Sequence, residues 1–307
     1  MIFRPIVKPE NSPYLQLLML AAYALAGLIV CSILGVLIII AGYGLDGLSN
    51  NALSGQDLKY LNGLKIFQIL SSIGLFLLPP IALAWEQTGA LKSFYGFRKP
   101  KIGFLFLVFL IMVCAMPFME WTALTNQKMA FPGFLKSIEE WMRTKEDEAM
   151  KMTILLLKVN SVWSFLLNLL MIALLPAVSE ELMFRGGVQR SFSRMFNNHH
   201  IAIWASAFIF SAIHMQFFGF VPRLLLGAVF GYLYYWSGSL WYAMLGHFLN
   251  NAYAVCAAWY LQSKNIPLTD ADDTFHFAWY GYALSFIVAI FLLKYFKTKT
   301  SNEQQLD

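Results

Sequence analysis

Long apolar runs, interrupted by short polar stretches, fill most of the chain. A helix that crosses a bilayer needs about 20 predominantly apolar residues, and eight runs approach that length. They cover residues 15–41, 64–85, 102–120, 159–179, 201–218, 222–237, 239–261 and 277–296. The pattern therefore predicts an all-α polytopic integral membrane protein with about eight transmembrane helices, forming a single membrane domain over residues 1–307.

Two details of the pattern predict how particular segments pack. Only the turn around Gly238 separates the sixth run from the seventh, which suits an antiparallel helix pair. Gly227 and Gly231 lie one helical turn apart in the sixth run. Small residues at this spacing let a neighbouring helix approach closely, so we expect a close helix contact there.

An amphipathic insertion precedes the fourth run. Within residues 121–153, apolar side chains recur at Leu135, Ile138, Trp141 and Met142, with charged side chains between them. This spacing predicts a helix with one apolar face. Such a helix lies on the bilayer surface, or it serves as a lid or a docking element for a substrate, and the sequence leaves both readings open.

Composition excludes several classes of protein. Hydrophobic residues make up 59% of the chain and charged residues 13%, against about 45–50% and about 25% in soluble domains. A soluble enzyme, a disordered chain and a nucleic-acid-binding module are therefore excluded. The net charge of +5 comes from Lys and Arg that gather at the ends of apolar runs, where they anchor helices at lipid headgroups. Their distribution favours both termini in the cytoplasm. We expect a multi-pass protein of the plasma (inner) membrane.

Charged side chains next to apolar runs are candidates for function, because burying a charge in lipid is costly. Two adjacent carboxylates, Glu180 and Glu181, close the fourth run, and Arg185 follows them. On a helix, Glu181 and Arg185 lie one turn apart and can pair, whereas Glu180 is rotated by about 100° from Glu181. We expect the arginine to hold Glu181 and Glu180 to be free to point into a cavity and act as a base. An interfacial helix end with a salt bridge has the same spacing.

Two further polar clusters lie in later runs. Phe210 and His214 are four residues apart in the fifth run, and His247 and Asn251 have the same spacing in the seventh, so each pair shares a helix face. Each pair also has a structural reading, as a hydrogen-bonded packing residue or as a polar bond between helices. Asn250 is rotated by about 100° from Asn251 and is expected to tolerate substitution.

Together these clusters supply the groups that hydrolysis requires. A carboxylate can activate water, while imidazole and amide groups can stabilise an oxyanion. Neither a Gly-x-Ser-x-Gly nor an HExxH sequence accompanies them. Water, rather than a side chain, is therefore the expected nucleophile.

The three motifs resemble those of the CPBP family of intramembrane proteases, which includes CAAX prenyl endopeptidases and bacteriocin-processing (Abi) enzymes. The family carries EExxxR, FxxxH and HxxxN or HxxxD on three spanning helices. Here these motifs stand in the same order, as Glu180-Glu181…Arg185, Phe210…His214 and His247…Asn251. The resemblance covers roughly residues 160–260, which we expect to form the protease core.

The resemblance implies a role for each motif residue. Glu180 with His214 would activate the attacking water, and His247 with Asn251 would bind the oxyanion. Structural support would come from Glu181, Arg185 and Phe210. The partners would be the lipid bilayer and a membrane-associated peptide or protein, either CAAX-like or a leader peptide, with no nucleic acid.

Metal dependence is left open by the residue types. The family is often classed as metalloproteases, and zinc accepts His nitrogen and Glu oxygen while leaving a position for water. If zinc is present, Glu180, His214 and His247 would hold it, but the same residues can act without zinc.

Two alternatives and one misfit accompany this interpretation. A non-catalytic immunity or scaffold protein of the same fold would use the polar cluster only to hold helices together. A proton-coupled transporter would also bury Glu and His, although repeats or broken helices in both halves would then be expected.

The misfit concerns the depth of the two histidines in the membrane. His214 lies about 20 Å from Ile201 along a helix, but His247 lies only about 10 Å from Leu240. Either the fifth helix is tilted or it begins beyond His200.

Overall fold

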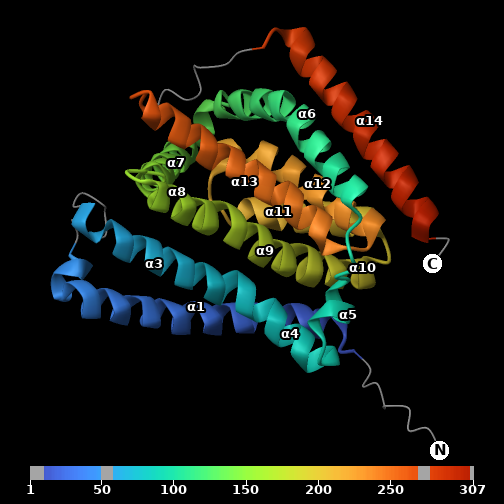
Figure 1. Cartoon of the computed structure of the whole chain (residues 1–307), viewed down its shortest axis with the longest axis horizontal. Coiled ribbons are helices and arrows are strands. Elements are labelled where there is room, and N and C mark those ends of the chain that lie inside the picture. The colour runs from blue at the N-terminus through green and yellow to red at the C-terminus, as the bar shows by residue number, and fades with distance from the viewer. Residues whose placement is uncertain (1–9, 50–57, 269–276, 305–307) are drawn as a thin grey trace, which may run out of the picture.

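The protein is built from helices packed side by side (Figure 1). The computed structural model describes residues 10–49, 58–268 and 277–304, and no strand occurs within these segments. Its α-helices are α1(Pro13–Tyr43), α3(Leu61–Ser72), α4(Leu78–Thr88), α5(Leu91–Tyr95), α6(Ile102–Gln127), α7(Lys136–Leu156), α8(Val162–Asn168), α9(Leu175–Glu181), α10(Arg190–Phe196), α11(His199–Ala212), α12(Phe220–Ser237), α13(Leu240–Ser263) and α14(Trp279–Gln304). The all-α prediction is confirmed. The two ends, whose cytoplasmic location was predicted, reach into residues 1–9 and 305–307, which lie outside the described segments.

Six helical stretches of the described chain are long and apolar enough to cross a membrane. They are Pro13–Tyr43, Leu61–Thr88, Ile102–Gln127, Val162–Phe196, Phe217–Ser237 and Trp279–Thr300. The other two predicted runs also form helices. Of these, α11 is shorter, and α13 carries His247, Asn250 and Asn251 among its apolar residues. The chain is therefore a multi-pass membrane protein in which six of the eight predicted spans meet this criterion.

Helix α13 occupies the centre of the molecule. It contacts α6, α9 and α12, while α14 packs on α6 at one side and α1 packs on α3 and α4 at the other (Figure 1). The helix α1 and the stretch after α3 meet at Gly27 and Gly74, where a Cβ added to Gly27 would lie 2.2 Å from the Gly74 oxygen. Only glycine allows this approach of the two backbones.

Proline residues accompany wide turns in two of the long helices. The π-helical segments η3(Ile73–Leu77) and η5(Leu169–Leu174) lie just before Pro79 and Pro176, respectively. Proline has no N–H to donate to the carbonyl four residues earlier, so the regular α-helical ladder is interrupted there. A third π-helical segment, η6(Leu182–Gln189), directly follows Glu181. The helix that carries the acidic doublet is therefore irregular on both sides of it.

The predicted end of the fifth run was wrong. Helix α11 starts at His199, where the Asn198 side chain accepts hydrogen bonds from two backbone N–H groups, and it ends at Ala212. A turn with Met215 at a φ of 54° and the short 3₁₀ segment η7(Phe217–Gly219) then lead into α12. The apolar run continues through this turn, so hydropathy does not reveal the helix end. His214 therefore lies in the turn, beyond the helix end, and the depth counted along a helix does not apply to it.

The predicted pairing of the sixth and seventh runs is confirmed. Helix α12 ends at Ser237, Gly238 takes the left-handed conformation with a φ of 63°, and α13 starts at Leu240. The predicted small-residue contact is also present on α12. A Cβ added to Gly231 would lie 2.9 Å from the Ile203 side chain of α11, and one added to Gly227 would lie 3.1 Å from Ala207.

The amphipathic insertion forms α7, which packs against η7. The Phe218 N–H donates to Oε2 of Glu146 at 3.2 Å, and the Trp141 and Phe217 rings lie 5.4 Å apart. The Arg143 guanidinium lies 4.3 Å from the centre of the Phe218 ring. Helix α7 is therefore attached to the turn that carries His214.

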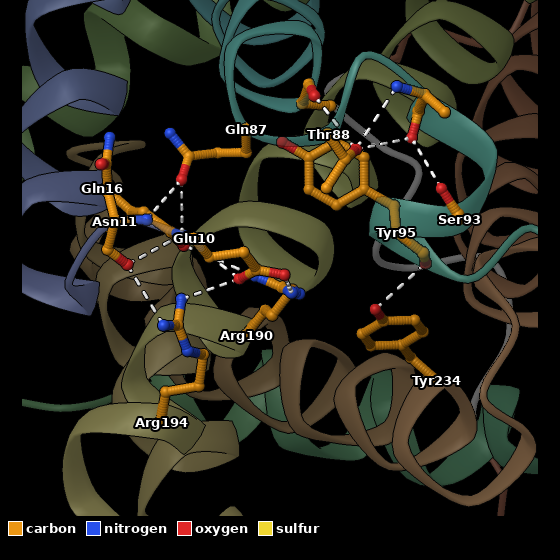
Figure 2. A network of polar contacts seen from close by, with 12 residues as sticks. Glu10, Asn11, Gln16, Gln87, Thr88, Ser93, Tyr95, Arg190, Arg194 and Tyr234 are labelled. Carbon is orange, nitrogen blue, oxygen red and sulfur yellow. Dashed lines mark hydrogen bonds and ion pairs between the residues drawn. The ribbon is translucent and has the colours of Figure 1, made fainter. Parts of the chain in front are cut away.

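An N-terminal polar network joins the residues before α1 to α4 and α10 (Figure 2). Glu10 accepts hydrogen bonds from Arg190 at 2.6 Å and from Arg194 at 3.0 Å, and the Asn11 N–H donates to Gln87 at 2.7 Å. The network fixes the start of α1 against the end of the helix that carries the acidic doublet.

Candidate active site

The two carboxylates of the acidic doublet lie in different environments, as their helical spacing predicts. Glu181 Oε1 lies 2.9 Å from Nη1 of Arg185, and the side chains of the two residues are 0% and 1% exposed. Arg185 also donates to the Gly227 carbonyl at 2.9 Å and lies between the rings of Phe210 and Phe230, at 4.7 and 5.4 Å. The predicted pairing of Glu181 with Arg185 is therefore present, and it is fully enclosed.

Glu180 points away from this pair and lines a cavity. Oε2 of Glu180 lies 3.9 Å from Nε2 of His247. Among the described residues, no arginine or lysine lies within ion-pair distance of Glu180. The second carboxylate is thus available to a bound molecule.

His247 is held by Glu181. Its Nδ1 donates to Oε1 of Glu181 at 2.8 Å, and its ring stacks on Phe230 with 12° between the planes. A carboxylate oxygen can only accept here, so Nδ1 carries a proton and Nε2 faces Glu180. Arg185, Glu181 and His247 therefore form one buried chain of contacts, which the sequence did not predict.

His214 has a comparable arrangement. Its Nδ1 donates to the Phe210 carbonyl at 2.8 Å, and the two rings pack edge to face at 5.2 Å. Because a carbonyl can only accept, the neutral ring leaves Nε2 as an acceptor. The four-residue spacing thus brings Phe210 and His214 together even though the helix has ended between them.

Asn251 replaces a backbone donor that Pro176 lacks. In an α-helix, the N–H of residue 176 would donate to the carbonyl of Ile172, but proline has no N–H. The side-chain Nδ2 of Asn251 donates to that carbonyl at 3.0 Å, and its Oδ1 accepts from Asn250 at 3.1 Å. One N–H of the Asn251 amide remains for a ligand.

These side chains line one cavity of about 480 Å³. Glu180, His214, His247 and Asn251 all contribute to its wall, and so does Phe210. Gln68 of α3 and Thr153 and Leu156 of α7 close another part of it. A second, largely apolar cavity of about 380 Å³ shares Gln68 and Leu156. The site therefore combines a carboxylate, two imidazoles and an amide in the wall of one cavity.

Sequence reasoning missed three parts of this cavity. Asn250 lines it despite its rotation from Asn251, and Arg223 at the start of α12 lines it as well. The end of α7 forms part of the wall, which favours the lid or docking reading of the insertion over that of a helix lying free on the bilayer. Arg223 could have been noticed, since it is the one charged residue in the run 222–237.

The donor set does not meet the geometry of a metal site in this structure. Within the described segments, no group of three or more His, Cys, Asp or Glu side chains is close enough together to hold a metal ion. Glu180, His214 and His247 share the cavity without converging on one point. We therefore derive no step through a metal.

Comparison with known proteins identifies the region around this site. Residues 162–253 match the family model described as type II CAAX prenyl endopeptidase Rce1-like. A curated relative, the uncharacterized protein YpbD of Bacillus subtilis (strain 168), is 29% identical over 93 residues, which cover 29% of this chain and 44% of YpbD. The alignment thus spans less than half of that relative. No solved structure gives a significant match.

The match confirms the resemblance to the CPBP family carried by the three motifs, since all of them lie within residues 162–253. At the family level, it indicates a protease, that is, a hydrolase acting on peptide bonds. Together with the six apolar helices, it indicates an integral multi-pass membrane protein.

Proposed function

We propose that this chain is an intramembrane endopeptidase that hydrolyses a peptide bond of a membrane-associated substrate with activated water. One observation carries the proposal. The two adjacent carboxylates have different environments, because Glu181 is enclosed by Arg185 and His247 while Glu180 faces the cavity. Packing alone accounts for the first carboxylate but gives the second no arginine or lysine partner among the described residues, so a non-catalytic scaffold is not favoured.

Glu180 and His214 are the proposed water-activating groups. The free carboxylate of Glu180 accepts a proton from water as the oxygen attacks the carbonyl carbon of the substrate. Nε2 of His214 is an acceptor in the neutral ring, so it can orient the same water. When the C–N bond breaks, the proton passes from Glu180 to the leaving amine.

His247 and Asn251 are the proposed oxyanion donors. They lie one turn apart on α13, so their donors can converge on one point. Nδ1 of His247 already donates to Glu181, and Nε2 must also carry a proton to donate to the oxyanion. The proposed step therefore uses the imidazolium form of His247, beside two carboxylates that balance its charge.

The proposed substrate is a membrane-associated peptide, either CAAX-like or a leader peptide. The description of the matched family and the apolar part of the cavity wall support this class. We further propose that the protein resides in the plasma (inner) membrane with cytoplasmic termini, and that residues 160–260 form the protease core of a single membrane domain.

Cleavage by the purified full chain in detergent tests the proposal. We expect the wild type to cut members of a membrane-peptide library, with products identified by mass spectrometry, and Glu180→Gln to abolish this cleavage. Glu140→Gln is the matched control, because Glu140 belongs to a similar acidic doublet on the exposed side of α7, away from the cavity. Cleavage by a folded Glu180→Gln variant at the wild-type rate would contradict the proposal.

A further inference from the structure

Arg223 places a second charge in the cavity, opposite in sign to that of Glu180. It lies in the first turn of α12, within a stretch apolar enough to span the membrane, and it lines the cavity together with Glu180 and His214. A charged side chain in such a segment is costly and normally has a partner that offsets the cost.

The only hydrogen-bond partner of Arg223 among the described residues is the uncharged Gln216. Nη2 of Arg223 donates to Oε1 of Gln216 at 2.6 Å, and Nη1 lies 3.5 Å from the Gln216 carbonyl. In the described part of the chain, no carboxylate lies within ion-pair distance of the guanidinium. Glu146 and Glu180 act on it only from further away. The arginine is therefore oriented by the protein but not neutralised by direct contact.

The guanidinium lies beside Gly219, which also lines the cavity. A Cβ added to Gly219 would lie 3.2 Å from Nη2 of Arg223, so a larger side chain there would crowd the group. A guanidinium has five N–H donors in a planar fork that matches a carboxylate. Gln216 uses only part of this set.

We propose that Arg223 determines specificity by binding a carboxylate of the substrate, on the C-terminal side of the cleaved bond. This inference rests on the proposed function and adds the chemistry that the site recognises. Glu180 repels an anion, so a carboxylate on Arg223 orients the peptide with its anionic end away from the base. The carboxylate is either the C-terminus of the peptide or an acidic side chain.

Matched peptides distinguish these two sources. One pair differs only in a C-terminal carboxylate or carboxamide. The other carries Asp or Asn at one position on the C-terminal side of the cleaved bond. Both pairs are built on a peptide that the wild-type chain cuts and the Glu180→Gln variant does not. We expect the wild type to favour the carboxylate member of at least one pair by about 10- to 100-fold in kcat/KM, the range of charge-assisted hydrogen bonds.

Substitution of the arginine then tests its role. Arg223→Gln should abolish the preference by slowing the carboxylate peptide while changing the neutral peptide less than about threefold, and Arg223→Lys should keep part of the preference. Arg143→Gln is the matched control, because Arg143 contacts the same turn through Phe218 but does not line the cavity. It should leave the preference unchanged.

The outcomes separate the two proposals. Three outcomes would overturn the role of Arg223 and leave the proposed protease function intact. The wild type shows no preference, Arg223→Gln loses activity equally on both members of a pair, or Arg223→Gln keeps the wild-type preference. If Arg223→Gln does not fold, Arg223→Lys decides, since loss of activity on both peptides alike contradicts carboxylate binding. Absence of any Glu180-dependent cleavage overturns the proposed function itself.

Discussion

Asn251 has a structural contact and a proposed catalytic role, and two substitutions can separate them. Its amide donates to the Ile172 carbonyl, which lacks its usual donor because residue 176 is proline. In the proposed mechanism, the remaining N–H binds the oxyanion. Asn251→Ala removes both contacts, whereas Pro176→Ala restores a backbone N–H that can take over the first one.

The two contacts differ in expected magnitude. A hydrogen bond between membrane helices contributes about 0.6 kcal/mol on average and at most about 1.7 kcal/mol. Loss of one oxyanion donor costs about 10²–10³ in kcat, or about 2.7–4 kcal/mol. Asn251→Ala should therefore lower kcat by orders of magnitude while lowering the free energy of unfolding by only about 1 kcal/mol. In the Pro176→Ala background, the stability loss should shrink and the loss in kcat should persist.

Two quantities are measured on the wild type, Asn251→Ala, Pro176→Ala and the double variant. They are the free energy of unfolding in mixed detergent and kcat from single-turnover cleavage, and each gives one double-mutant cycle. Pro176 lines the cavity, so kcat is compared between each variant and its own background. If the loss in kcat from Asn251→Ala is below about fivefold, or if it disappears with Pro176→Ala as the stability loss does, Asn251 only supports the helix. Asn250→Ala should have a smaller effect on kcat, since Asn250 contacts Oδ1 of Asn251 and not its N–H groups.

Three other predictions follow from the described contacts. Arg185→Gln should lower the free energy of unfolding by about 3–5 kcal/mol, because it leaves the buried Glu181 carboxylate without its cation; a stability equal to that of the wild type would contradict this role. Burial acts to raise the pKa of Glu10, but the hydrogen bond and charge of Arg190 outweigh it and lower that pKa below its usual value. Glu10 thus stabilises the fold at pH values above the pKa that it has in the unfolded chain. This contribution is lost as the pH falls through the lower pKa of Glu10 in the folded chain. Thermal unfolding between pH 6 and 3 should show a steeper loss for the wild type than for Glu10→Gln, and parallel curves would refute this. Prolonged chelation should leave cleavage intact, because Glu180, His214 and His247 do not converge on one point in the described structure; loss of activity that zinc restores would contradict this.

Local helical geometry was predictable from the sequence. The four-residue spacing paired Glu181 with Arg185, and the rotation between neighbours turned Glu180 toward the cavity. Both results depend only on the period of one helix. The glycines of α12 were predictable for the same reason, since a stripe of small residues permits close packing whatever the partner is.

Contacts between distant helices were not predictable in the same way. The bond from His247 to Glu181 and that from Asn251 to Ile172 join residues far apart in the sequence. Periodicity identifies the face of a helix but not what that face meets. The end of α11 was missed for a different reason, because apolar residues such as Ile213, Met215 and Phe217 continue the hydrophobic pattern beyond the end of the helix.

The wide turns on either side of the acidic doublet also bear on how sequences of this kind can diverge in length. A π-helical turn holds one residue more than the α-helical turn it replaces, so it can absorb a single-residue insertion without rotating the flanking segments. Loss of one residue from Leu169–Leu174 would close the wide turn and leave the orientation of Glu180 nearly unchanged. The same deletion within α9, before the doublet, would rotate the doublet by about 100°, so that Glu181 takes the position of Glu180 and Glu180 takes that of Ser179. Alignments that tolerate a one-residue gap before Pro176, but none between Pro176 and Arg185, would record this difference.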